Sequence, residues 1–271
     1  MSKRTFVGVC FVPLTVLLAA FFLLPMARLM LTGASGQDGL RAYAAILLDS
    51  RYRATLLNTI SLAAATTIAT LVIAAISGLF LQRHRFPGHA LLVAMLTFPL
   101  AFPGVVVGFM IILLAGRQGL LGDLTLRLFG TKAVFAYSLQ GLFLGYLYFS
   151  IPRVILTIMA AAEKLDPSLE EAARALGAGP WRLARDIILP ALAPAFIASG
   201  AIAFATAMGA FGTAFTLATD VAVLPMLIYT EFTLSANIAL AAALSVGLGL
   251  VTWAILALAR SYGGTSIAAA G

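Results

Sequence analysis

Charge is scarce in this sequence. Only 10% of the 271 residues are charged and 62% are hydrophobic, whereas a soluble domain has about a quarter of its residues charged and about half apolar. This composition excludes an ordinary soluble protein and indicates a membrane protein. Cysteine is nearly absent too, because Cys10 is the one cysteine. It excludes an internal disulfide, and a thiol packed among apolar residues is the simplest interpretation.

Motifs of enzymatic chemistry are also missing. No GxxxxGK[ST] loop is present to cradle the phosphates of ATP. His84 and His89 have no cysteine or carboxylate cluster beside them, which argues against a metal site. We find no nucleophile and base pair, and no pair of carboxylates inside an apolar segment, that would indicate an enzyme or a proton-driven pump. We therefore expect no catalytic residue, no metal site and no cofactor in this chain.

Long intervals without any charge are what the sequence has instead. They cover residues 5–27, 54–82, 86–116, 133–152, 187–219 and 232–259. Each is long enough for the roughly 20 residues of a membrane-spanning helix. The runs are continuous and not alternating, which favours helices over a β-barrel. The predicted fold class is all-α, a polytopic membrane protein that forms one domain over residues 1–271. Its six spans are expected at about 6–31, 56–82, 90–115, 134–160, 194–217 and 235–259.

The first interval also resembles a signal peptide, because Lys3 and Arg4 precede it and small residues follow it. Its charge-free core is longer than the 7 to 15 residues usual in signal peptides, so we expect it to remain as the first span. With the N-terminus inside, nine basic residues would lie on inner segments and seven on outer ones. This bias favours an inside N-terminus only weakly. The net charge of +7 requires no nucleic-acid partner, because the basic residues gather at membrane edges near anionic headgroups.

One block concentrates the charge that the rest of the chain lacks. Residues 163–186 hold nine of the 27 charged residues. Asp166 is placed as an N-cap, Pro167 as the first helical residue and Gly177 just past the end of a short helix. Glu170 and Arg174 are spaced to pair at i, i+4. The apolar positions expected to share one face of this helix are Leu165, Leu169, Ala172, Ala173 and Leu176.

A second amphipathic helix is predicted to open at Pro180, after the turn at Gly177 to Gly179. Pro190 and Pro194 would then lead into the fifth span. Its apolar side is expected to hold Trp181, Ala184 and Ile188, and its polar side Arg182, Arg185 and Asp186. Taken alone, the whole block is compatible with a solvated loop that lies on the lipid headgroups.

A sequence motif within the block favours a different role. Glu171, Ala172 and Ala173 are followed after three residues by Gly177, and then after nine residues by Ile187, one residue, Leu189 and Pro190. This pattern resembles the EAA motif of the permease subunits of ATP-binding cassette importers with the type I fold. The resemblance extends from Pro99 to about Leu240.

That resemblance implies a cytoplasmic coupling helix between spans four and five, within residues 163–190, that sits in a cleft of a separate ATPase subunit. Both termini would then be cytoplasmic, in a bacterial inner membrane. The residues expected to contact the ATPase or to shape the contact are Glu170, Glu171, Ala172, Ala173, Leu176, Gly177 and Gly179. Gly177 suits this place because it permits a positive φ.

The resemblance also implies partners. These are two ATPase subunits that bind ATP and magnesium, a second permease of the same or a homologous sequence, and a periplasmic or lipid-anchored substrate-binding protein. Two alternatives remain open from the residues alone. The first is a stand-alone channel or ion-coupled carrier, although no span contains an acidic residue, and the second is a membrane-anchored interaction protein.

Candidates for the path of the solute are more dispersed. Pro99 and Pro103 break the third span, either as a cavity wall or as a structural kink. Apart from Arg28 near the end of the first span, Arg153 is the one charge inside a predicted span, either in gating or substrate passage or at an interface. Residues 208–213, with Phe211 and Thr213, resemble a stretch of the polyamine, ferric iron, sulfate and phosphonate branch. The pairs expected to serve helix packing are Gly104 with Gly108 and Gly141 with Gly145.

Two acidic residues are expected near the outer surface. Asp220 and Glu231 would either meet the binding protein or be solvated acids. For the solute itself, the resemblance suggests a polyamine or an aminoalkylphosphonate, with ferric iron and sulfate as alternatives.

Overall fold

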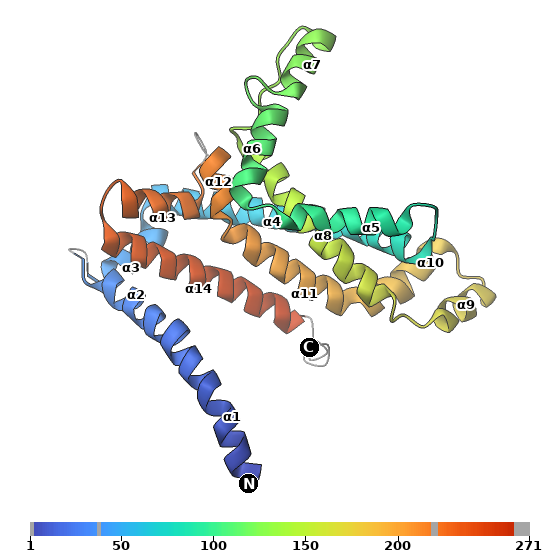
Figure 1. Ribbon diagram of the computed structural model, residues 1–271, viewed down its shortest axis with the longest axis horizontal. Helices are drawn as coiled ribbons and strands as arrows, with labels where there is room; N and C mark the ends of the chain where they lie inside the picture. The colour runs from blue at the N-terminus through green and yellow to red at the C-terminus, as the bar shows by residue number, and fades with distance from the viewer. Residues whose placement is uncertain (1–2, 37–38, 218–221, 263–271) are drawn as a thin grey trace. The chain divides into compact units, whose positions relative to one another are not determined.

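The computed structural model describes residues 3–36, 39–217 and 222–262, and every regular element in these residues is a helix (Figure 1). The helices are α1 (Lys3–Leu18), α2 (Leu24–Ala34), α3 (Arg41–Leu48), α4 (Ser50–Arg83), α5 (His89–Thr97), α6 (Gly104–Ala115), α7 (Leu120–Phe129), α8 (Leu139–Ala162), α9 (Pro167–Ala175), α10 (Pro180–Leu183), α11 (Leu189–Met208), α12 (Phe211–Leu217), α13 (Leu224–Thr233) and α14 (Ile238–Tyr262). Three short segments join some of them: the π-helices η1 (Ala19–Leu23) and η3 (Ala184–Ile188) and the 3₁₀-helix η2 (Phe98–Ala101).

Six stretches of helix in the described part of the chain are long and apolar enough to cross a membrane. They are Phe11–Ala34, Ser50–Arg83, Gly104–Phe129, Leu139–Ala162, Pro180–Met208 and Ile238–Ser261. The prediction of an all-helical chain with six spans is therefore confirmed. The third and fifth stretches differ most from the expected bounds, and both differences have a local cause.

The third span was expected at 90–115, and the helix breaks inside that interval. α5 ends at Thr97, η2 makes one tight turn, and the backbone is extended at Phe102 and Pro103 before α6 begins. Pro99 and Pro103 lack the N–H groups that a continuous helix needs at these positions. Apolar length is recovered at the other end, because α7 follows α6 closely.

The fifth span was expected at 194–217, but the helix starts earlier and stops earlier. α10, η3 and α11 form one continuous helix over Pro180–Met208, so Pro190 does not separate a surface helix from the span. The reason lies in η3, where the N–H of Leu189 bonds to the carbonyl of Ala184, five residues back. This wider turn leaves room for Pro190, which has no N–H to donate. The helix ends at Met208, and α12 begins separately.

The chain forms two compact units. Unit 1 comprises Met1–Leu56 with Leu227–Val251, and unit 2 comprises Leu57–Met226 with Thr252–Gly271. In unit 1, small residues allow close helix approach: a Cβ at Gly33 would meet Tyr43 of α3 and Ala243 of α14.

The core of unit 2 joins α4, α8 and the helix from α10 to α11. Buried apolar side chains from all three fill it: Ala74, Leu81, Val154, Ile155, Ile158, Leu183, Ile188, Leu192 and Ala203. Gly78 of α4 packs on Ile158, where a Cβ would come within 3.2 Å of that side chain. This core holds the α8–α11 connection, which carries the charged block.

Candidate functional site

The N-terminal end of α9 has the cap that the sequence predicts. The carboxylate of Asp166 accepts a hydrogen bond from the backbone N–H of Ser168 at 2.9 Å, and Pro167 is the first helical residue. This hydrogen bond stabilises the ionised form and lowers the pKa of Asp166. The side chain is fully exposed, so the cap is a local feature of the segment.

The C-terminal end of α9 forms a Schellman motif. The N–H of Gly177 bonds to the carbonyl of Arg174 at 2.9 Å, and the N–H of Ala178 bonds to that of Ala173 at 3.0 Å. Gly177 has φ of +82°, and a Cβ there would meet nothing within 4 Å. The turn therefore needs glycine for its backbone conformation. Gly179 has an ordinary φ of −73° and equally open surroundings, so no contact within the chain requires a glycine at that position.

The apolar face predicted for α9 divides in two. Leu165 and Ala173 pack against the core of unit 2, as expected of a docking face. The other three apolar residues, Leu169, Ala172 and Leu176, are exposed, and Leu176 is 89% exposed. α9 is thus anchored by one strip and presents a second apolar strip outward.

Glu170 anchors α9 by charge. It pairs with Arg174 at 3.7 Å, as the i, i+4 spacing predicts, and it also pairs with Arg83 at the end of α4. Its side chain is only 17% exposed, so Glu170 joins α9 to the core more than it faces water, while Glu171 is exposed. The sequence did not reveal Arg83 as the partner, because Arg83 only marks the end of a charge-free interval.

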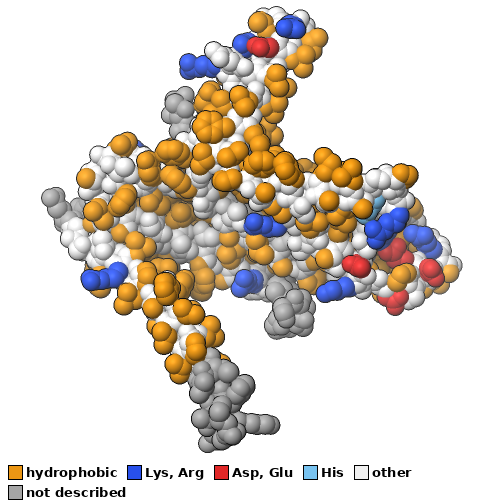
Figure 2. All heavy atoms as spheres, in the orientation of Figure 1, with side chains coloured by type: hydrophobic (Ala, Val, Ile, Leu, Met, Phe, Trp, Pro, Cys, Tyr) orange, Lys and Arg blue, Asp and Glu red, His pale blue; other side chains and the backbone are white. Residues whose placement is uncertain are grey.

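The predicted sides of the segment after Pro180 are partly wrong. Ile188 is buried as expected, but Trp181 is exposed, and Leu183 is buried in its place. The reason is that this segment is the first part of a long helix packed on α4 and α8, and not an independent surface helix. Figure 2 shows acidic and basic side chains gathered around α9, beside surfaces covered by apolar side chains.

The residues predicted for the solute path do not form one cluster. Pro99 and Pro103 lie at the break between α5 and α6. Phe211 is partly exposed and lies against Phe215, with ring centroids 5.4 Å apart. Thr213 is 1% exposed, and its hydroxyl donates to the carbonyl of Gly104 at 3.1 Å. Thr213 is therefore a packing residue of the junction between α6 and α12.

Glycines make this junction possible, as the small-residue pairs predict. A Cβ at Gly108 would meet the Cβ of Thr216 at 2.5 Å, and one at Gly145 of α8 would meet the Cγ2 of Thr213 at 2.6 Å. Both distances are far below ordinary contact. The α6, α8 and α12 backbones approach closely because these residues have no side chain.

Arg153 is exposed on α8 and has one polar contact. Its Nη1 lies 3.4 Å from the Oγ1 of Thr206 on α11. None of the ion pairs within the described residues includes Arg153; these pairs are Arg83–Glu170, Lys132–Asp123, Arg174–Glu170 and Arg185–Asp186.

A polar groove of about 530 Å³ lies between α5 and the ends of α4 and α8. Its wall includes Arg85, His89 and Glu163, and it extends to Thr97, next to the proline break. The Nε2 of the buried His89 lies 2.8 Å from the carbonyl of Leu81 and its Nδ1 3.4 Å from Arg85. Because a carbonyl only accepts, Nε2 carries a proton, and Nδ1 accepts from Arg85.

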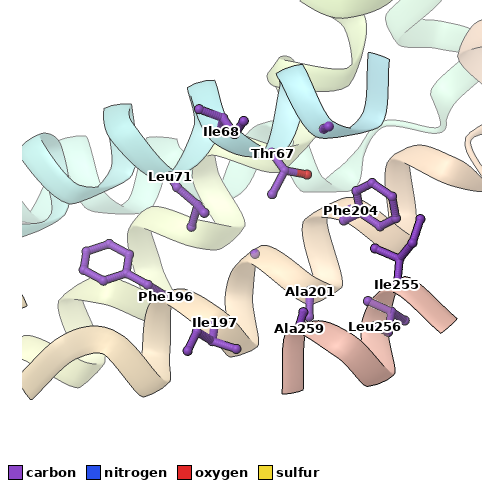
Figure 3. Close-up of a pocket in the computed structure, with 12 residues that line it drawn as sticks. Thr67, Ile68, Leu71, Phe196, Ile197, Ala201, Phe204, Ile255, Leu256 and Ala259 are labelled. Carbon is purple, nitrogen blue, oxygen red and sulfur yellow. The ribbon is translucent and has the colours of Figure 1, made fainter. Parts of the chain in front are cut away.

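A second groove of about 480 Å³ is apolar and lies between α4, α11 and α14 (Figure 3). Phe196 and Phe204 approach it from α11, and Ile255 and Leu256 from α14. The wall of this groove includes Thr67, whose hydroxyl donates to the carbonyl of Ala63 at 2.8 Å. This groove suits hydrocarbon and offers nothing that would recognise a polar solute.

Neither expectation for Glu231 holds. It is only 7% exposed, so it is neither a solvated acid nor available to a binding protein. Asp220 lies outside the described residues. Within the described part of the chain, no group of three His, Cys, Asp or Glu side chains could hold a metal ion.

Comparison with known proteins agrees with this geometry. Residues 71–262 match the family model described as "Binding-protein-dependent transport system inner membrane component". The chain is 36% identical over 176 residues to the molybdenum transport system permease protein ModB of Escherichia coli (strain K12), covering 65% of this chain and 76% of that protein. It is 31% identical over 262 residues to the putative 2-aminoethylphosphonate transport system permease protein PhnU of Salmonella typhimurium (strain LT2), covering 93% of this chain and 91% of that protein.

The fold is also similar to a solved structure. The crystal structure is that of a bacterial alginate ABC transporter in complex with an alginate pentasaccharide-bound periplasmic protein. The TM-score is 0.83 at 15% identity, over 98% of this chain and 96% of that chain. At this identity the likeness concerns the fold alone. The family match decides between the interpretations that the residues left open, and neither a stand-alone channel or carrier nor a mere membrane anchor remains. The chain belongs to the binding-protein-dependent transport system inner membrane components, which are multi-pass permease subunits of ATP-binding cassette importers whose ATPase is a separate chain.

Proposed function

We propose that this chain forms the translocation path of an importer by alternating access, and that α9 transmits the movement of a separate ATPase to it. The observation that carries the proposal is the division of α9 into an anchored strip and an outward strip. Ala173 and Glu170 hold the helix to unit 2, while Leu176 is exposed on a segment otherwise rich in charge. The exposed apolar strip of Leu169, Ala172 and Leu176 on such a segment is typical of an interaction site.

In this proposal the α8–α11 connection faces the cytoplasm, and so do both termini. Glu171, Ala172, Leu176, Gly177 and Gly179 contact the ATPase or shape the contact, and the small size of Ala172 and Gly179 allows close approach. The chain acts with two ATPases that bind ATP and magnesium, a second permease of the same or a homologous sequence, and a periplasmic or lipid-anchored binding protein. The alginate transporter offers a precedent, because it was solved with a periplasmic protein.

The proposed solute is an aminoalkylphosphonate or a related small oxyanion. Supporting this choice, the likeness to a 2-aminoethylphosphonate permease runs over 93% of the chain. A polyamine, the other solute suggested by the sequence, has no support from these relatives. In this proposal the residues that line the path of the solute are Arg153, Phe211, Pro99 and Pro103. The buried Thr213 acts indirectly, by holding α12 against α6.

Copurification with the ATPase tests the coupling role. Leu176→Asp and Glu171→Arg change exposed side chains outside the core, and Leu176 caps α9 through its backbone N–H, which the substitution keeps. We expect each to reduce the ATPase recovered with the tagged chain from native membranes by at least fivefold, and to reduce uptake in proportion.

A matched control is Leu234→Asp, which adds the same charge at an exposed leucine that lies just after α13 and outside all six membrane-spanning stretches. It should leave ATPase recovery at the wild-type value. If ATPase recovery and uptake survive both α9 changes, the coupling role is wrong. If Leu234→Asp lowers ATPase recovery equally, the effect is not specific to α9.

A further inference from the structure

Arg153 lies deep within a helix that is long enough to span a membrane. At 1.5 Å per residue, it stands roughly 14 Å along the α8 axis from Ala162 and roughly 21 Å from Leu139. A charge at such a depth is costly unless it faces water or a partner, or can reach an interface. The depth of Arg153 therefore requires either water or a compensating group beside it.

No acidic side chain of the described residues supplies that compensation. The contact of Arg153 is the hydroxyl of Thr206, and this hydroxyl donates its own hydrogen to the carbonyl of Ile202 at 2.7 Å. The oxygen of Thr206 therefore accepts from Arg153. A guanidinium has five N–H donors, so this long hydrogen bond leaves most of them for another acceptor.

The surface around Arg153 also suits a path. In one direction along α8, Phe149 lies one turn away, beside Tyr146, whose hydroxyl bonds to the carbonyl of Ala210 ahead of α12. In the other direction, Ala160 lies seven residues on, which places it on the same side of the helix as Arg153. Ala160 is part of the wall of the polar groove with Arg85, His89 and Glu163. The exposed side of α8 thus leads from α12 past Arg153 to a polar opening.

We propose that Arg153, held by Thr206, is an anion-binding station at mid-depth in the translocation path, and that the transported solute is a small oxyanion. This inference rests on the proposed function and adds the residue that selects the charge of the solute. A planar guanidinium can bind two oxygens of a phosphonate or sulfate group at once. A lipid phosphate has the same chemistry, so the tests must distinguish a solute from a headgroup.

Uptake by the complete transporter tests whether the positive charge of Arg153 is needed to transport an anionic solute. The probes are sulfate, molybdate and 2-aminoethylphosphonate, each radiolabelled, with proteoliposomes that contain the transporter purified through this chain and the substrate-binding protein. We expect the wild type to take up at least one probe, and Arg153→Gln to reduce that uptake at least tenfold while ATPase recovery and ATP hydrolysis persist. Arg153→Lys keeps the positive charge and should stay within about threefold of wild type.

Two threonines provide matched controls. Thr206→Val removes the hydroxyl that holds the guanidinium and should reduce uptake about twofold. Thr157→Val removes a hydroxyl on the same helix that donates to the backbone carbonyl of Arg153 and makes no side-chain contact with it. Thr157→Val should therefore transport as wild type.

Water accessibility tests the path without any solute. Because Cys10 is the one cysteine of the sequence, a Cys10→Ser background allows a thiol to be placed at position 153 alone. Arg153→Cys should react in membranes with a water-soluble, charged methanethiosulfonate reagent. Ile68→Cys, in the apolar groove of Figure 3, should not react.

Several results would overturn the inference. They are uptake by Arg153→Gln equal to wild type, wild-type uptake of none of the three probes, and a thiol at position 153 that does not react. A defect of Arg153→Gln that appears only when phosphatidylglycerol is added to phosphatidylcholine vesicles would assign Arg153 to a headgroup and would also overturn it. Loss of the ATPase from the wild-type preparation would contradict the proposed function and not the anion station.

Discussion

The turn after α9 and the junction of α6, α8 and α12 both depend on glycine, but for opposite reasons. Gly177 has a positive φ and open space around its missing side chain. Gly108 and Gly145 have ordinary backbone angles and would collide with Thr216 and Thr213 if they carried a Cβ. One glycine supplies a conformation, and the others supply room.

This difference separates two kinds of mechanical demand. A turn in open surroundings can tolerate a partner that approaches from outside, because no side chain of the same chain fills the space. A junction without room is fixed by its own packing, since apolar helices in lipid gain stability mainly from close contact. The α9 turn is therefore suited to an interface, and the α6–α12 junction to a rigid frame.

The strongest effect is expected at the junction of α6, α8 and α12, where a glycine has no space for a side chain. Gly108→Ala places a Cβ 2.5 Å from the Cβ of Thr216, and overpacking of this kind costs about 1–3 kcal/mol. We expect the free energy of unfolding in detergent to fall by about 3 kcal/mol. Thermal unfolding of the purified chain measures it.

Two further variants sharpen that result. Thr216→Gly removes the atom that the new Cβ strikes, and should restore much of the loss in the double variant. Gly249→Ala in α14 meets nothing within 4 Å and should be neutral or slightly stabilising. Equal losses at Gly108 and Gly249 would show that room is not the cause.

A smaller effect is expected at the turn after α9, where a glycine is needed for its positive φ. Gly177→Ala keeps the space open but forces an alanine into the left-handed region, at about 1 kcal/mol. ATPase recovery should fall about fivefold, while the melting temperature of the chain changes little. Gly179→Ala needs no unusual φ, so it should change ATPase recovery only if the ATPase directly contacts Gly179. A larger loss from Gly179→Ala than from Gly177→Ala would reverse the assignment of the two glycines.

The ion pair that anchors α9 comes next. Glu170→Gln removes the charge that faces Arg83 and Arg174, and we expect about 1 kcal/mol of local stability to be lost. Amide hydrogen exchange in α9 should become faster while that of α8 is unchanged. Arg174→Gln, which leaves the pair with Arg83 in place, is expected to have less effect, and an equal effect would show that Arg83 is not the main anchor.

The smallest effect concerns pH. The Ser168 N–H lowers the pKa of Asp166, so the stabilising cap is complete above the ordinary pKa of aspartate and is lost as pH falls through the lowered value. Hydrogen exchange of the first α9 turn, corrected for the intrinsic rate, should therefore show less protection in acid. Asp166→Asn keeps an acceptor without a carboxylate and should remove this pH dependence. A wild-type profile that is flat in acid would count against the cap.

The sequence predicted those features that depend on neighbouring residues. Charge-free intervals indicated the number of spans, and Asp166, Pro167 and Gly177 marked the ends of α9, because caps and turns are determined within a few residues. The anchor from Arg83 to Glu170 joins positions 87 residues apart, so no local pattern indicates it. The burial of Thr213 and Glu231 likewise depends on helices distant in sequence. The helix of the fifth span begins earlier than expected, because the π-turn before Pro190 lets the helix continue through a residue that sequence rules treat as a stop.

That continuous helix also has a mechanical consequence. Pro180–Met208 contains 29 residues, roughly 43 Å of rod at 1.5 Å per residue. A tilt of about 5° would swing one end against the other by roughly 4 Å. One end of the rod adjoins the α9 turn, and Thr206 lies in the last turn at the other. In the proposed coupling role, a force that the ATPase applies at α9 would tilt this helix, and the displacement at its other end would be enough to separate the Thr206 hydroxyl from Arg153 and to weaken the binding of an anion by the guanidinium.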